Sequence, residues 1–186
     1  ITITGKGNYS GTIKKTFKIT TPINSATVSN IKNKTYTGKA QTQNVVVKLK
    51  GKTLKKDKDY TVKYSNNKAV GTATITITGK GNYSGTIKKT FKISIKNSST
   101  YTIDTMKYKV TNARTDGKGT VELVSIPSNS KKTTITVPST VKISGKTFRV
   151  NSIGSKAFKN KTHVKKIVLG KYITKIGQES FYGCKN

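Results

Sequence analysis

The sequence is poor in cysteine, histidine, tryptophan and acidic residues, and the shortage of cysteine and histidine excludes several kinds of site. Its 186 residues include one cysteine, one histidine and no tryptophan. One cysteine cannot form a disulfide framework within the chain, and with a single histidine it cannot build a zinc finger or a His-based metal site. Six acidic residues stand against 37 basic ones, which gives a net charge of 37 − 6 = +31. No apolar run approaches the roughly 18 residues of a membrane-spanning helix, so we expect no membrane insertion.

The apolar residues that are present favour strands. They make up 32% of the chain, with 33 Val or Ile against 4 Leu, and 31 Thr add further β-branched side chains. Such side chains fit a pleated sheet better than a helix. Residues 74–78 alternate three threonines with two isoleucines, as a strand with one buried face requires. The sequence therefore predicts an all-β protein.

An internal repeat divides the first half of the chain. Residues 1–19 recur letter for letter at 75–93, an offset of 74 residues, which is the length of one small β-sandwich module. We interpret 1–19 as the C-terminal hairpin remnant of a truncated module and 20–95 as one complete sandwich. Because 1–19 can compete for the place of 75–93 in its own or another chain's module, we also expect strand exchange or dimerisation. Alternation and turn residues predict strands at 35–38, 44–50, 52–54, 60–65, 71–78 and 85–93.

A shorter period follows a polar linker that begins at residue 96. Segments 150–158 and 173–181 share an Ile-Gly pair followed four residues later by Phe, at an offset of 173 − 150 = 23 residues. Segments 135–138 and 167–170 align at 167 − 135 = 32 residues, and the extra nine predict an inserted hairpin with strands 140–143 and 147–150. An offset of 23 lies within the range of leucine-rich repeats, and such an array needs a cap, for which we assign residues 101–132.

These segments resemble two known families. Residues 34–38 (KTYTG), 58–67 (KDYTVKYSNN) and 71–85 resemble the bacterial Ig-like repeats of Gram-positive surface proteins. The two Ile-Gly…Phe segments, the second extended to Cys184, resemble the start of a BspA-like leucine-rich-repeat array. The resemblance implies an Ig-like β-sandwich at 20–95 and a β cap with the first leucine-rich repeats at 96–186. It also implies an extracellular, adhesin-like protein of the bacterial cell surface, in which an Ig-like stalk presents a repeat platform to a ligand.

The side chains that could carry catalysis are few and scattered. Asp57 and Asp59 form a D-x-D pair that could ligate calcium or act as acid and base, but lysines crowd it, and a turn whose Asp accepts backbone N–H bonds is the better interpretation. His163 has no nucleophile or carboxylate placed beside it by spacing. Cys184 occupies a repeat position that is normally filled for packing. We therefore predict no catalytic, metal-binding or cofactor-binding residues and no enzymatic activity.

The positive charge leaves more than one function open. Residues 1–94 carry a net charge of 19 − 2 = +17 and residues 95–186 a net charge of 18 − 4 = +14, so the charge is spread rather than focused. Only two of the basic residues are Arg, which disfavours base readout, and we expect no specific nucleic-acid partner. A surface protein or glycan is the expected ligand, and an anionic wall polymer is attracted by charge. The alternatives are a purely structural cell-wall spacer and a module that binds teichoic acid or sulfated glycans.

The predicted ligand-facing residues are the outward positions of the two segments aligned at an offset of 32. Alternation turns every second side chain inward, which we assign to Ile135, Val137, Ile167 and Leu169. The side chains between them then point outward from adjacent strands onto the face that repeat arrays use for binding. These are Thr134, Thr136, Lys166 and Val168. An open alternative is that these side chains belong to the first repeats of a longer array, whose ligand contacts we would then expect beyond Asn186.

Overall fold

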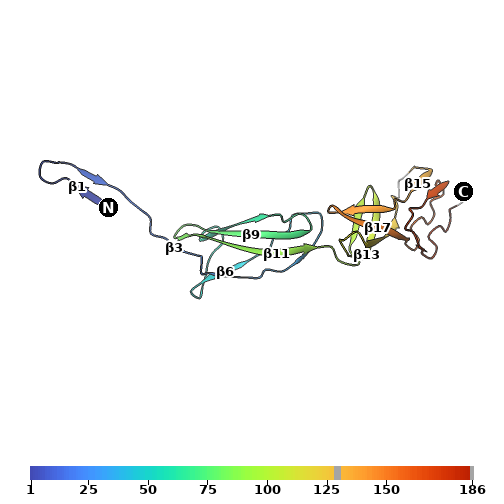
Figure 1. The fold of residues 1–186 in the computed structure, drawn as a ribbon, viewed down its shortest axis with the longest axis horizontal. Coiled ribbons are helices and arrows are strands. Elements are labelled where there is room, and N and C mark those ends of the chain that lie inside the picture. The colour runs from blue at the N-terminus through green and yellow to red at the C-terminus, as the bar shows by residue number, and fades with distance from the viewer. Residues whose placement is uncertain (128–130, 185–186) are drawn as a thin grey trace. The chain divides into compact units, whose positions relative to one another are not determined.

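The regular structure of the described residues consists of strands, which confirms the predicted all-β class. The computed structural model describes residues 1–127 and 131–184 (Figure 1). Residues 128–130 of the predicted cap and 185–186 of the predicted repeats lie outside this described part. The strands belong to two compact units, one of residues 1–33, 41–67 and 71–92 and the other of residues 34–40, 68–70 and 93–186. Within the described part there is no helix that could cross a membrane.

The first 19 residues form an isolated hairpin. Its strands β1 (Thr2–Thr4) and β2 (Thr12–Lys14) pair antiparallel. Every residue of the hairpin is exposed, including its isoleucines and Phe17. A two-stranded hairpin with an uncovered apolar face has little stability of its own.

Residues 20–94 contain two larger sheets and one short strand pair. The first sheet has the order β5 (Lys34–Thr35), β11 (Thr86–Ser94), β9 (Gly71–Gly79), β8 (Tyr60–Ser65). The second has the order β4 (Thr27–Ser29), β6 (Val46–Leu49), β7 (Lys52–Thr53). In addition, β3 (Thr21–Pro22) pairs in parallel with β10 (Tyr83–Ser84). Each larger sheet buries alternate side chains, and none of the side chains of Val47, Leu49, Ile75 and Ile77 is more than 6% exposed.

The predicted strand at 60–65 is observed with those bounds, and its tyrosines tie β8 to the chain before β6. Tyr64 Oη donates to Gln43 O at 2.5 Å, and Tyr60 Oη lies 3.4 Å from Val45 O. The predicted strand at 35–38 is too long. Pairing ends at Thr35, and Gly38 has a φ of 79°, a left-handed conformation that breaks an extended strand.

The second unit is built on one mixed sheet of six strands. Its main path has the order β12 (Thr100–Ile103), β13 (Met106–Asn112), β14 (Gly119–Ser125), β17 (Lys146–Ile153), β16 (Thr140–Ile143), and β19 (Lys175–Ile176) also pairs with β17. The hairpin predicted from the nine-residue insertion is confirmed as β16 and β17. Its turn residues Ser144 and Gly145 have φ values of 50° and 73°, which is typical of a type I′ turn. This hairpin joins the cap sheet through parallel pairing of β17 with β14.

Both predicted repeat offsets are confirmed as strand registers. β15 (Thr134–Thr136) pairs in parallel with β18 (Lys166–Val168), with Ile135 opposite Ile167, an offset of 32. Ile153 of β17 lies opposite Ile176 of β19, an offset of 23. The rings of Phe158 and Phe181 stack at the same offset, with centroids 5.3 Å apart.

Two glycines let the repeats approach each other closely. A Cβ on Gly170 would lie 2.6 Å from the Cα of Ser139, and one on Gly177 would lie 2.7 Å from the carbonyl carbon of Gly154. No side chain fits at such distances. Glycine is therefore required at position 170, although the aligned segment 135–138 has Pro138 at the equivalent position. The same close approach accounts for glycine in the second Ile-Gly pair.

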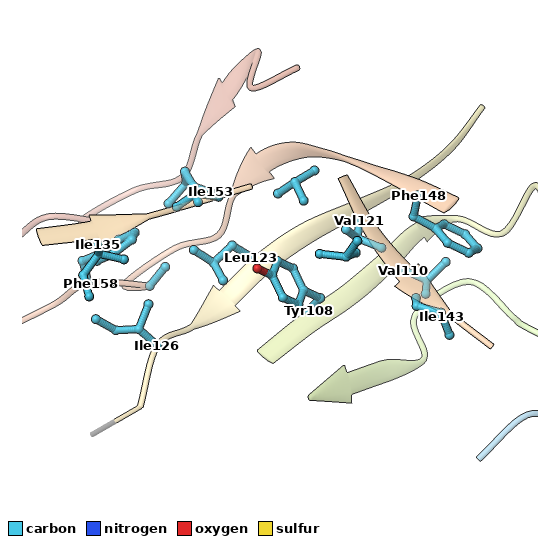
Figure 2. Close-up of a cluster of buried hydrophobic side chains, with 14 of the residues drawn as sticks. Tyr108, Val110, Val121, Leu123, Ile126, Ile135, Ile143, Phe148, Ile153 and Phe158 are labelled. Atoms are coloured by element: carbon cyan, nitrogen blue, oxygen red, sulfur yellow. The ribbon is translucent and has the colours of Figure 1, made fainter. Parts of the chain in front are cut away.

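Cap and repeats share one hydrophobic core. Tyr108 and Leu123 from the cap strands and Ile135, Ile153 and Phe158 from the repeats belong to one buried cluster, and none of them is more than 3% exposed (Figure 2). The expectation that Leu169 points inward is wrong, because its side chain is 39% exposed. Strand pairing with β15 ends at Val168, so Leu169 lies outside the register that the alternation describes.

Replacing Phe148 by Ala is expected to lower the free energy of unfolding of the second unit by about 3–5 kcal/mol, because the ring is fully buried and leaves a cavity. Val168→Ala, at a side chain that is 41% exposed, is the control and is expected to change it by no more than about 0.5 kcal/mol. Urea denaturation followed by tyrosine fluorescence measures both. Equal losses in the two variants would contradict this account of the core.

Candidate functional site

The four predicted ligand-facing residues lie together on one exposed face, which we call the ladder face. Thr134 is opposite Lys166, and Thr136 is opposite Val168, on the parallel pair β15–β18. All four side chains are exposed, whereas Ile135 between them is 3% exposed. Lys165 and Lys166 both donate their backbone N–H to Thr133 O, at 2.7 and 3.0 Å, which fixes the start of β18 beside β15.

The ladder face continues into a groove at Thr136, which we call the first groove. It has a volume of about 430 Å³ and lies between the β12–β13 hairpin and the chain from β15 to β16. Its walls combine half-buried apolar side chains with a carboxylate and an ammonium group. The lining residues are Ile103, Asp104, Met106, Tyr108, Thr136, Pro138, Thr140, Val141 and Lys142.

A second groove, of about 490 Å³, shares Ile103, Asp104 and Lys142 with the first. Its other residues come from 36–38, from β12 and from the β16–β17 turn. Tyr36 and Tyr101 stand side by side there, with ring centroids 5.7 Å apart and an angle of 35° between the rings. An aromatic pair next to hydroxyl groups offers both an apolar surface and hydrogen-bonding atoms to a ligand.

Backbone contacts hold the walls of the second groove. Tyr101 Oη donates to Tyr36 O at 3.0 Å, which anchors the 34–40 segment on β12. The backbone N–H of Val70 donates to Ser144 Oγ at 2.9 Å, which anchors the 68–70 segment on the β16–β17 turn. Both grooves are therefore assembled from segments that lie far apart in the sequence.

The turn at the shared rim is strained. Asp104 and Thr105 connect β12 to β13 with φ values of 46° and 72°, both in the left-handed region. Glycine and asparagine favour that region, whereas a β-branched residue such as Thr105 does not, and such strain often marks a functional position. Thr105 Oγ1 donates to the carbonyl oxygen of Asp104, a local bond that helps to hold the turn.

Tyr108 forms the floor of the first groove, and its phenol is held neutral. Burial raises the pKa of Tyr108 to about 12, and the nearby Asp104 carboxylate adds to the shift because a second negative charge is unfavourable. The phenol group lies 3.4 Å from the sulfur of Met106, a weak contact that leaves the ring packed in the core. Burial therefore keeps the floor of the groove uncharged at pH values where an exposed tyrosine would already ionise.

The residues considered for catalysis are held in structural contacts. Asp59 Oδ2 accepts the backbone N–H of Lys55 at 2.8 Å, as expected for a turn. Asp57 has a φ of 66°, and its carbonyl oxygen accepts a hydrogen bond from Lys80 Nζ. The thiol of Cys184 donates to Phe158 O at 3.2 Å and packs against the core. Among the described residues, no group of three or more His, Cys, Asp and Glu could hold a metal ion.

His163 and two further carboxylates of the second unit, Asp116 and Glu179, are not among the residues that line the two grooves. His163 is half-buried, and its Nε2 has no hydrogen-bond partner among the described residues. Arg114 holds Asp116 at 2.6 Å and lowers the pKa of that carboxyl to about 2. Lys159 pairs with Glu179 at 2.8 Å and lowers the pKa of Glu179 below its ordinary value.

Sequence reasoning found the ladder face but missed the grooves. The signal for the β12–β13 hairpin is present, because Asp104 and Thr105 separate the alternating segments 101–103 and 106–110. Its position next to Thr136 depends on the pairing of β14 with β17, and no local pattern in the sequence indicates that pairing.

Comparison with known proteins does not assign the chain to a family. No protein-family model matches the sequence, and no curated protein matches it. Among solved structures, it is similar to the crystal structure of a leucine-rich cell surface protein from Faecalibacterium prausnitzii A2-165, at 22% sequence identity and a TM-score of 0.37. The similarity covers 48% of this chain and 22% of that chain, so this chain spans less than a quarter of that protein's length.

The raised pKa of Tyr108 predicts a loss of stability at high pH. The neutral phenol is favoured in the folded state, so its stabilisation is fully present below the ordinary pKa of about 10 and is lost as the pH rises through about 12. The free energy of unfolding of the intact chain should therefore fall, relative to that of Tyr108→Phe, across this window. Urea denaturation at a series of pH values measures the difference, and a difference that does not change with pH would contradict the prediction.

Proposed function

We propose that this chain is a non-enzymatic interaction protein of the bacterial cell surface, and that it binds its ligand on the ladder face and in the first groove. One observation carries the proposal. The exposed side chains of the ladder face lie in register, with Thr134 opposite Lys166 and Thr136 opposite Val168. Thr136 also lines the first groove, so the two surfaces are continuous. In this proposal residues 20–95 serve as a stalk. The extracellular location rests on the sequence resemblance to bacterial Ig-like and BspA-like repeats.

The composition of the site favours a polar ligand such as a glycan or an extended polypeptide. Thr136 and Thr140 offer hydroxyl groups, and the exposed Asp104 and Lys142 offer charges of both signs at the rim. Apolar surface from Ile103 and Met106 lies between them. Hydroxyl groups and charges of both signs give direction to binding, while the apolar wall supplies the burial that stabilises a complex.

A second candidate function is the binding of anionic polymers such as teichoic acid. The excess of positive charge favours this function, because the six acidic side chains can neutralise at most six of the 37 basic ones. Binding of that kind releases counterions and weakens steeply with salt, and it needs no particular face of the molecule. The two functions therefore differ in their response to salt and to substitutions on the ladder face.

The variant Thr136→Asp with Val168→Asp is expected to abolish ligand binding without unfolding the chain, because both side chains are exposed. The matched control is Thr72→Asp with Thr90→Asp, which makes the same charge change at exposed positions of β9 and β11. Retention of each variant is measured on immobilised teichoic acid, heparin, duplex DNA and neutral glycans, at low salt and at roughly 0.3 M salt.

The proposal expects one probe to be retained at high salt by the intact chain and the control, but not by the ladder-face variant. Release of every probe together at high salt, with equal behaviour of both variants, would assign binding to the overall charge instead. Failure to bind any probe at low salt would favour the role of a structural spacer.

A further inference from the structure

The second groove has no excess of positive charge, although the chain has 37 basic residues against six acidic ones. Its lining includes one ammonium group, that of Lys142, and one carboxylate, that of Asp104, so the two charges cancel. Four further lining residues carry aliphatic hydroxyl groups, namely Thr37, Thr100, Thr102 and Ser144. A groove of this composition suits an uncharged ligand with many hydroxyl groups better than a polyanion.

The carboxylate of Asp104 is available to such a ligand. Its side chain is exposed, and among the described residues no hydrogen bond or ion pair occupies its carboxylate oxygens. By contrast, Asp59 accepts a backbone N–H, and Asp116 and Glu179 form ion pairs. A carboxylate has two acceptor oxygens, so it can bind two neighbouring hydroxyl groups of one sugar ring.

Tyr36 and Tyr101 give the groove an aromatic wall. Their ring centroids lie 5.7 Å apart, and both side chains are half-buried against the core of the second unit, which holds them in place. A sugar ring has apolar faces of C–H groups and edges that carry hydroxyl groups. An aromatic ring that ends in a polar group can therefore contact both parts of it.

The free edge of β12 adds backbone groups to the same wall. Val110 N–H donates to Ser99 O at 2.8 Å, and along an antiparallel pair such bonded positions alternate. Tyr101, like Ser99, therefore directs its N–H and C=O groups toward β13, whereas Thr100 and Thr102 direct theirs away from it. Within the part of the chain that the structure describes, β12 ends the strand order, so these groups lie along the groove.

The dimensions of the groove favour a compact ligand over an added strand. A peptide that extends a sheet is held by main-chain bonds along the edge strand, and β12 offers two residues for such bonds, Thr100 and Thr102. The groove volume of about 490 Å³ falls in the range of about 300–1,000 Å³ that is usual for sites of small ligands. A short oligosaccharide meets both conditions.

We infer that the second groove binds a neutral glycan, with one sugar ring against Tyr36 and Tyr101 and its hydroxyl groups held by Asp104 and by the edge of β12. The site is additional to the ladder face and the first groove. Tyr36 and Tyr101 line the second groove and not the first, and the proposed function does not depend on them. All of these residues belong to the second unit.

Substitutions at Asp104 and Tyr36 test this inference. The intact chain is applied to an array of neutral oligosaccharides, and the one that is retained best at roughly 0.3 M salt is titrated with tyrosine fluorescence as the signal. Asp104→Asn keeps the left-handed turn, which asparagine adopts readily, and is expected to weaken binding about tenfold. Tyr36→Leu removes the ring but leaves the bond from Tyr101 Oη to the backbone, and is also expected to weaken binding about tenfold.

Three further variants serve as controls. Tyr36→Phe keeps the ring and is expected to change the affinity less than about threefold. Asp57→Asn makes the same charge change as Asp104→Asn, also at a left-handed position, with a φ of 66°, but in the first unit and outside both grooves. It is expected to bind like the intact chain. Thr136→Asp with Val168→Asp is also expected to retain the glycan, so loss of the ladder-face ligand and loss of this site are distinguishable.

The inference is overturned if no neutral oligosaccharide is retained at the higher salt concentration. It is also overturned if Asp104→Asn binds as tightly as Asp57→Asn, or if Tyr36→Leu binds as tightly as Tyr36→Phe. Retention of extended peptides in place of the oligosaccharides would assign the groove to strand addition on β12 instead.

Discussion

The parallel pairing of β14 with β17 is the contact on which the second unit depends. It joins the hairpins 106–125 and 140–153 into one sheet, and it places Val121 beside Val150 and Leu123 beside Ile153. The pairing needs a residue without a side chain at its start, because a Cβ on Gly119 would lie 2.7 Å from the ring of Phe148. Through this sheet the β12–β13 turn comes to lie next to the end of β15, and the two grooves form between them.

The sequence predicts those parts of the fold that depend on repetition. In a parallel stack, the offset between two similar segments equals the register between their strands, so the offsets of 23 and 32 predict the partners of Ile153 and Ile135. The same alternation predicts which side chains of β15 and β18 face outward. It does not indicate where a sheet ends, which is why Leu169 is exposed. The grooves could not be predicted, because residues 103–108 meet 136–142 only through the folded sheet.

Scarce carboxylates leave aromatic rings as partners for the cations of the second unit. The guanidinium of Arg149 lies 4.9 Å from the ring centre of Tyr172, and Lys171 Nζ lies 5.2 Å from the same ring. Lys159, which also pairs with Glu179, lies 4.9 Å from the ring centre of Tyr182. Each exposed contact of this kind contributes about 0.5–1 kcal/mol. A chain with six acidic residues can therefore still organise its cations locally.

The short parallel pair β3–β10 determines how residues 20–95 respond to mechanical tension. A pull applied at Thr20 and at Ile95 draws β3 and the β10–β11 segment in opposite directions along their length. The bonds from Thr21 N–H to Asn82 O and from Ile23 N–H to Ser84 O, at 2.9 and 2.8 Å, then share the load at the same moment. Strands loaded in this way must slide rather than unzip, so the module resists stretching at the end where the chain enters it.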